Sequence, residues 1–313
     1  MSRLQKFKSI IFTALFLTSN NLHAGAYYHF VGWLNAFVPG SGEILLGSPH
    51  LGVLEAASEI GTFYAGYKLS KKSPMTLDGV PEDIPQFNRK RSRSQVSIAR
   101  PLFADWLQEF GIKEHFVNTY NVYRSAAKSD GGSSGIDQTS TNDLFLAPFK
   151  PAILKDPWVL IPLGLIAAYS TYDYLATLHD GVDRVPIFTP ASNYLYSLTN
   201  LGIFPVGSAA PEEMFFHGFL QNEFYQLIST PFFSIPLTSV LFAFAHEPGD
   251  GRYTAAISGA YMGLLAHMNQ GKLSPGIALH FWSVLILGIE EVLLMHKAQH
   301  SLPPTGFSIQ ITY

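Results

Sequence analysis

The chain has 313 residues, of which 47% are hydrophobic, 14% are charged and none is cysteine, and its formal net charge is −3. Soluble domains carry about 25% charged residues, so this composition predicts contact with lipid, and the lack of a basic surplus argues against a nucleic-acid partner. The absence of cysteine excludes disulfides, thiolate zinc sites, iron–sulfur clusters and cysteine nucleophiles, so any metal would need His, Asp or Glu ligands.

The first 24 residues have the pattern of a secretory signal peptide. Basic residues precede the apolar run Ile10–Leu17, and Ala24 supplies the small residue that signal peptidase favours. We expect cleavage after Ala24, and the alternative, suggested by the bulky Leu22, is an uncleaved first anchor. In both cases residue 25 emerges on the far side of a membrane.

Residues 25–69 form an apolar, membrane-associated segment that is broken at Pro39, Gly40 and Gly42 and contains Glu55 and Glu59. This pattern fits two short spans, one span beside an interfacial segment, or a re-entrant loop. Of the 20 Lys and Arg residues, 12 lie in residues 68–150. Because positively charged segments stay in the cytoplasm, this distribution favours one net crossing before the basic segment.

A mean hydropathy of only +0.16 predicts a polar insert, and residues 70–150 supply it. The insert contains a basic run at residues 89–93, and Ser129–Thr141 has the composition of a disordered linker. Between them, Leu102–Tyr123 has apolar residues near helical spacing. This pattern fits a helix that lies along a membrane surface or on the core.

Residues 151–300 are expected to form a polytopic bundle of transmembrane helices, followed by a tail at residues 301–313, so the predicted fold class is all-α. Gly259 and Gly263 form a GxxxG pair, which lets helix backbones approach closely in lipid. Proline, glycine or charged residues separate six candidate apolar stretches: Trp158–Leu178, Ser192–Gly207, Ala209–Ile228, Phe232–His246, Tyr253–Met268 and Pro275–Met295.

Two adjacent carboxylates and a histidine follow Pro211 in an apolar helical stretch: Glu212, Glu213 and His217. Proline suits a first helical turn, where the helix dipole also favours one acidic residue. Two carboxylates inside a membrane are costly, which indicates proton, ion or catalytic work. Glu213 and His217 are four residues apart and share a helix face, whereas Glu212 projects about 100° away.

Two further histidines lie in apolar helical stretches. His246 is four residues after Phe242, and so on its face, near a helix end and beside a loop that could admit water. His280 lies in a helix that is expected to begin with Pro275. Each histidine alone suits a capping or core role. Together, two Glu and two His on three apolar helices could converge on one water or one metal.

The three motifs, in this order, resemble those of the CPBP intramembrane proteases, the family of type II CAAX prenyl endopeptidases and of bacteriocin-processing or immunity (Abi-like) proteins. The family pattern is EExxxR, FxxxH, and HxxxN or HxxxD. The corresponding segments here are Glu212–His217, Phe242–His246 and His280–Val284. The resemblance covers residues 155–296 and does not reach the insert.

The chain departs from the family pattern at two positions. His217 stands where the family has Arg, and Val284 where it has Asn or Asp. A protonated His217 could pair with Glu213 as the Arg would. Val284 cannot hydrogen-bond a water or a carbonyl, so that role is lost or passes to another group such as Ser283.

The resemblance implies the catalytic set Glu212, Glu213, His246 and His280, supported by His217 and Phe242. Glu212 would be the general base, His246 would hold and polarise the water, and His280 would orient the water and oxyanion or bind a metal. The resemblance does not decide whether the site binds zinc. Glu212, His246 and His280 could be three zinc ligands with an open position, but one Glu cannot easily be both ligand and base.

The sequence therefore predicts an intramembrane endopeptidase, a metallo- or glutamate-dependent protease, that hydrolyses a peptide bond of a membrane-associated protein or peptide. We expect a multi-pass protein of a bacterial inner membrane, with the bilayer and the substrate as partners and no nucleic acid. The export signal argues against cytoplasmic prenylated substrates. The alternatives are a degenerate scaffold, a peptide or toxin immunity protein, or an ion- or ligand-binding membrane protein.

Overall fold

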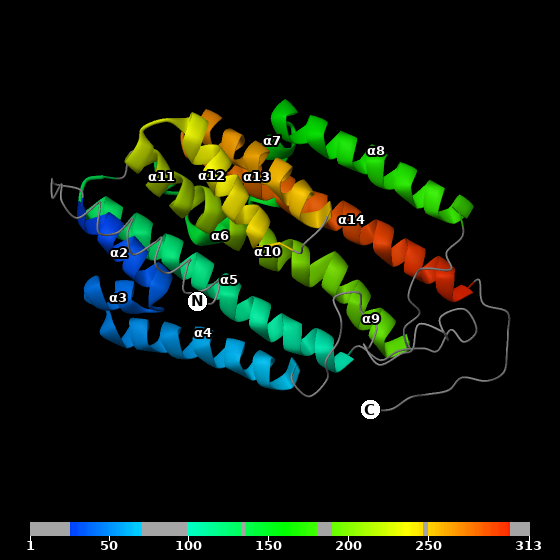
Figure 1. The fold of residues 1–313 in the computed structure, drawn as a ribbon, viewed down its shortest axis with the longest axis horizontal. Helices are drawn as coiled ribbons and strands as arrows, with labels where there is room; N and C mark the ends of the chain where they lie inside the picture. The colour runs from blue at the N-terminus through cyan, green and yellow to red at the C-terminus, as the bar shows by residue number, and fades with distance from the viewer. Residues whose placement is uncertain (1–25, 71–98, 133–134, 181–189, 247–249, 301–313) are drawn as a thin grey trace, which may run out of the picture. The chain divides into compact units, whose positions relative to one another are not determined.

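The computed structural model describes residues 26–70, 99–132, 135–180, 190–246 and 250–300. Every secondary-structure element in these ranges is helical, as Figure 1 shows, and this confirms the predicted all-α class for the described part of the chain. The predicted signal peptide, the basic run and the C-terminal tail lie outside the described residues.

The elements belong to two compact units. The first holds the described residues up to Ile60 together with Lys113–Lys150 and Ala210–Ile277, and the second holds the rest. The elements are α2 (Ala26–Phe37), α3 (Ser41–Leu45), α4 (Pro49–Ser70), α5 (Ala99–Ser129), α6 (Thr141–Phe145), η2 (Ala147–Phe149), α7 (Pro151–Leu154), α8 (Pro157–Asp180), α9 (Pro190–Leu198), η4 (Thr199–Ile203), α10 (Phe204–Glu212), η5 (Glu213–Leu220), α11 (Gln221–Ile228), α12 (Pro231–Phe244), α13 (Asp250–Met268) and α14 (Ser274–His300).

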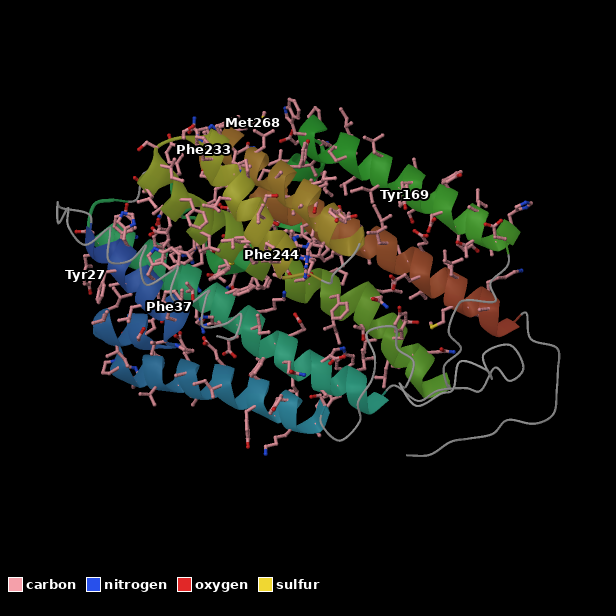
Figure 2. The ribbon with its side chains drawn as sticks, in the orientation of Figure 1. Tyr27, Phe37, Tyr169, Phe233, Phe244 and Met268 are labelled. Atoms are coloured by element: carbon pink, nitrogen blue, oxygen red, sulfur yellow. The ribbon has the colours of Figure 1, made fainter. Side chains whose placement is uncertain are left out.

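Two of these helices are long and apolar enough to cross a membrane: α8 and, over Ser274–Ala298, α14. They coincide with the first and last of the six predicted spans, and α12 is apolar but shorter. Large apolar side chains stand exposed on the helices, among them Tyr169 at 63%, Phe233 at 56% and Phe244 at 65% (Figure 2). Apolar exposure of this extent fits insertion into a membrane.

The described residues of segment 25–69 form three helices, α2, α3 and α4. The predicted break is confirmed at Pro39 and Gly40, which lie between α2 and α3, but it is wrong at Gly42, which lies inside α3. Gly40 has φ +75°, and a Cβ atom there would lie 1.8 Å from the carbonyl oxygen of Gly52. Only glycine combines this left-handed backbone with so close an approach of another chain segment.

The structure corrects the prediction of a disordered linker in the second half of the insert. Ile136 and Asp137 are each only 6% exposed. The Asp137 carboxylate accepts a hydrogen bond from the Leu273 backbone N–H at 2.8 Å, and its carbonyl accepts one from the Tyr120 hydroxyl at 2.8 Å. Polar composition predicts a loop, but it does not reveal that distant backbone and side-chain groups bind the loop and order it.

The GxxxG pair on α13 lies at a close helix contact, as predicted. A Cβ atom at Gly259 would lie 2.9 Å from the ring of Phe242 on α12, and one at Gly263 would lie 2.5 Å from the Gln221 side-chain oxygen. The missing side chains therefore let α13 pack directly against α12 and α11 within the first unit.

Candidate functional site

Glu212 and Glu213 lie at a change of helix type. Glu212 ends α10, and Glu213 begins the π-helical segment η5. The prediction that Pro211 opens a helix is wrong, because Pro211 lies inside α10, one residue before its end. Proline removes one backbone donor within the helix, and π-helical turns inside α-helices are frequent at functional sites.

The two oxygens of the Glu212 carboxylate face different partners. Oε1 forms an ion pair with the Nζ atom of Lys113 on α5, and Oε2 lies 3.9 Å from Nε2 of His246. The Glu212 side chain is 8% exposed and that of Lys113 17%. The first unit therefore brings together a buried carboxylate, an ammonium and an imidazole.

The hydrogen bonding of His246 determines what its second ring nitrogen presents to Glu212. Nδ1 lies 2.8 Å from the carbonyl oxygen of Phe242. A carbonyl can only accept, so Nδ1 carries the hydrogen and Nε2 of the neutral ring is an acceptor directed at Glu212. The side chain is 33% exposed, just after the end of α12, and its ring centroid lies 4.6 Å from that of Phe242. The predicted shared face of Phe242 and His246 is confirmed.

Glu213 faces a second group of residues. Its Oε2 atom lies 3.9 Å from Nε2 of His217, which is beyond hydrogen-bond distance. Nδ1 of His217 donates to the side-chain oxygen of Gln221 at 2.9 Å, and Gln221 in turn donates to the carbonyl of Gly263 at 2.9 Å. The predicted proximity of Glu213 and His217 is confirmed, and Gln221 connects this pair to α13.

His280 lies on the part of α14 that belongs to the second unit, and it is buried. As predicted, Pro275 lies in the first turn of this helix. The hydroxyl of Ser283 donates to the Leu279 carbonyl at 2.7 Å, so its hydrogen is used within its own helix. Convergence of His280 with Glu212 and His246 stays a prediction.

The residues of the first unit do not by themselves fit a catalytic zinc ion. Such an ion takes three protein ligands, whereas this unit brings together one carboxylate, that of Glu212, and one imidazole, that of His246, and the ammonium of Lys113 is bound to one oxygen of that carboxylate. Within the ranges that the structure describes, no three His, Asp or Glu residues are grouped closely enough to hold a metal.

Lys113 is the site residue that the sequence analysis missed. It lies in the insert, and its spacing of four from Glu109 is typical of an ordinary surface ion pair. The apolar spacing of 102–123 allowed a helix on the core, and Tyr120 and Tyr123 are fully buried, as that alternative requires. The apolar spacing therefore predicted that this helix could pack on the core, but nothing in the sequence indicated that Lys113 would pair with Glu212.

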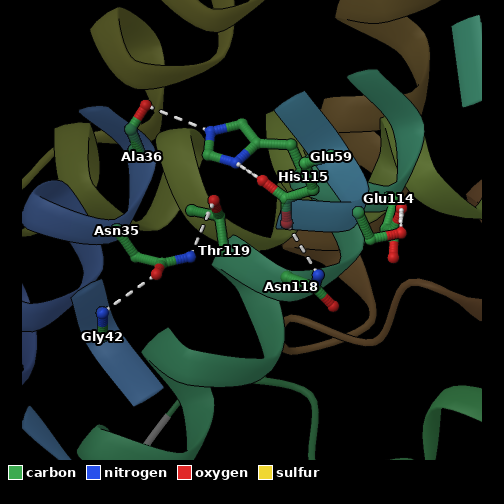
Figure 3. Close-up of polar contacts among 9 residues, drawn as sticks. Asn35, Ala36, Gly42, Glu59, Glu114, His115, Asn118 and Thr119 are labelled. Carbon is green, nitrogen blue, oxygen red and sulfur yellow. Dashed lines mark hydrogen bonds and ion pairs between the residues drawn. The ribbon is translucent and has the colours of Figure 1, made fainter. Parts of the chain in front are cut away.

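Polar contacts fix the turn of α5 that carries Lys113 (Figure 3). His115 lies 2.8 Å from a carboxylate oxygen of Glu59 through Nδ1 and 3.2 Å from the carbonyl of Ala36 through Nε2, and Asn118 donates to the other Glu59 oxygen at 2.7 Å. Acceptors thus face both ring nitrogens of His115 and fix the orientation of the ring.

The next residue of α5, Glu114, adds a contact to α4. Ser58 donates a hydrogen bond to it at 2.9 Å. Burial raises the pKa of Glu114, and the hydrogen bond from Ser58 opposes that shift. Residues 113–118 are therefore tied by side chains to α2 and α4 within the first unit.

Comparison with known proteins gives one family. Residues 194–286 match the family model described as type II CAAX prenyl endopeptidase Rce1-like. No curated protein and no solved structure matches the chain. The matched segment contains the three motifs at Glu212–His217, Phe242–His246 and His280–Val284, but not Lys113. The resemblance drawn from the motifs over residues 155–296 is therefore confirmed for residues 194–286, a segment similar to the type II CAAX prenyl endopeptidase Rce1-like family.

Proposed function

We propose that the protein is an intramembrane endopeptidase in which Glu212 and His246 activate a water for attack on a peptide carbonyl. The observation that carries this proposal is the approach of two acceptors, Oε2 of Glu212 and Nε2 of His246, to 3.9 Å. Two acceptors this close suit a water that donates one hydrogen to each over about 2.8 Å.

In the first step Glu212 takes a proton from the water while the water oxygen bonds to the peptide carbonyl carbon. The carbonyl oxygen becomes an oxyanion. The carbon–nitrogen bond then breaks, and the proton held by Glu212 passes to the departing amine, which regenerates the carboxylate. His246 orients the water by accepting its second hydrogen. Low exposure of Glu212 favours this chemistry, because electrostatic interactions are stronger away from bulk water.

The remaining predicted residues have supporting roles in this proposal. His217 links η5 to α13 through Gln221, Glu213 lies 3.9 Å from His217 and keeps the supporting role that the family resemblance implies, and Phe242 orients His246 through its carbonyl. His280 would complete the site by stabilising the oxyanion, a role taken from the family resemblance. No step in this scheme passes through a metal.

The proposed substrate is a membrane-associated peptide or protein, cleaved by a multi-pass protein of a bacterial inner membrane. The apolar helices α8 and α14, the exposed apolar side chains and the name of the matched family support a membrane setting. Nothing in the geometry around Glu212 selects a particular substrate sequence.

The proposal is tested by cleavage with the full-length protein reconstituted in lipid vesicles. The substrates are a fluorescence-quenched peptide library and a membrane-protein extract, with new N-termini identified by mass spectrometry. We expect cleavage by the wild type and none by the double variant Glu212→Gln/His246→Ala. Equal products from both proteins, or no product from the wild type, would overturn the proposal in favour of a scaffold.

Chelation distinguishes the proposed mechanism from a zinc-dependent one. Because Lys113 pairs with Glu212, we expect the cleavage rate of the wild type to be unchanged after incubation with EDTA or 1,10-phenanthroline, and its metal content to be well below one ion per chain. Loss of activity that added Zn²⁺ restores would show that the metal-free scheme is wrong.

A further inference from the structure

Building on the proposed function, we propose that Lys113 is a positioning residue of the reaction, supplied to the active site by the insert. Its ammonium binds Oε1 of Glu212, so that Oε2 is directed at His246. A carboxylate with one oxygen fixed in this way has a single basic oxygen facing the water position.

Aromatic side chains hold Lys113 in place. The Nζ atom lies 5.6 Å from the ring centroid of Phe116, a cation–π distance. Phe116 in turn stacks on Phe215 with a centroid distance of 4.2 Å and an interplanar angle of 9°. Since Phe215 is three residues after Glu212, the same stack joins α5 to η5. It thereby fixes the position of Lys113 along the axis of α5 relative to the Glu212 carboxylate.

The polar contacts of the adjacent residues fix the rotation of α5. His115 is held by Glu59 and Ala36, and Glu114 by Ser58. A helix that rotated by one residue about its axis, about 100°, would break these contacts and turn Lys113 away from Glu212. The arrangement is therefore defined from three sides: by α2, by α4 and by η5.

Charge explains why a lysine is needed at this position. A buried carboxylate without a partner is strongly unfavourable, and removing one member of a buried pair leaves the other uncompensated. The matched family segment, residues 194–286, supplies Glu212, and α5, which lies outside that segment, supplies the ammonium that pairs with its Oε1 atom.

The absence of cysteine from the chain allows a test that separates charge from folding. Lys113→Cys has a single thiol. Reaction with 2-bromoethylamine restores an ammonium at nearly the position of Nζ, whereas 2-bromoethanol adds a neutral group of similar size. Both adducts come from the same purified protein in vesicles, and mass spectrometry measures the extent of modification.

We expect Lys113→Cys and its hydroxyethyl adduct to lower kcat by about 100-fold with little change in KM, and the aminoethyl adduct to recover most of this loss. Lys150→Met, which removes an exposed lysine paired with Asp143 at 3.0 Å, is the matched control and should keep wild-type kcat. Equal kcat for the two adducts would overturn the role of Lys113 while leaving the proposed function intact. A wild type that cleaves no peptide would overturn the proposed function and this role with it.

Discussion

Replacing Glu212 with Gln is expected to lower kcat for peptide cleavage by at least about 100-fold, the lower end of what a general base contributes. Gln has nearly the same shape and retains an oxygen that can accept a hydrogen bond from Lys113, so the position of the lysine is largely kept although the ion pair is lost. The amide cannot take a proton from the water, and one of its two polar atoms becomes a donor. The loss should therefore appear in kcat, with KM close to that of the wild type.

Glu223→Gln is the matched control for this substitution. Glu223 is also a buried glutamate of the first unit, but its oxygens accept from Trp33 at 2.7 Å and pair with His29 at 2.6 Å, away from Glu212. We expect Glu223→Gln to lower the thermal midpoint in detergent without a comparable loss of kcat. If Glu212→Gln retains more than about a tenth of the wild-type kcat, Glu212 is not the base.

The second large effect is expected for Gly271→Ala, a change outside the site. Gly271 has φ +87°, and a Cβ atom there would lie 2.0 Å from the backbone carbonyl oxygen of Gly135. The left-handed conformation costs a non-glycine residue about 1–2 kcal/mol, and displacing packed backbone adds about 1–3 kcal/mol. We expect a total loss of about 3 kcal/mol of unfolding free energy, measured by reversible denaturation in mixed micelles.

Gly131→Ala separates the two causes. Gly131 has a similar φ of +74°, but no atom lies within 4 Å of the position of an added Cβ. The unfolding free energy of this variant should fall only by the conformational cost of the left-handed backbone, about 1 kcal/mol. Equal losses for Gly131→Ala and Gly271→Ala would mean that residues near Gly135 do not pack against the segment before α14, and that the composition-based prediction of a disordered linker is right after all.

Several features of this protein could be predicted from the sequence because they depend on neighbours along the chain. Among the described residues, the apolar lengths of 158–178 and 275–295 correspond to α8 and α14, the two helices long and apolar enough to cross a membrane, whereas the other four predicted spans are not confirmed. The four-residue spacings of Glu213 with His217 and of Phe242 with His246 place each pair on one face, as the structure confirms. The order of three short motifs predicted a family resemblance over residues 155–296, and the Rce1-like family model matches residues 194–286 within that range.

Only the tertiary structure could decide how the carboxylate of Glu212 is held. Lys113 is 99 residues away in the chain, and its local spacing is that of a surface lysine, so no periodicity connects it to the site. The same reason applies to Asp137, whose polar surroundings in sequence suggest a linker while Leu273 and Tyr120 order it in space. Local patterns determine which residues share a helix face. Long-range packing determines which charges meet, because the partner that stabilises a buried charge is chosen by the fold and not by the residues beside it.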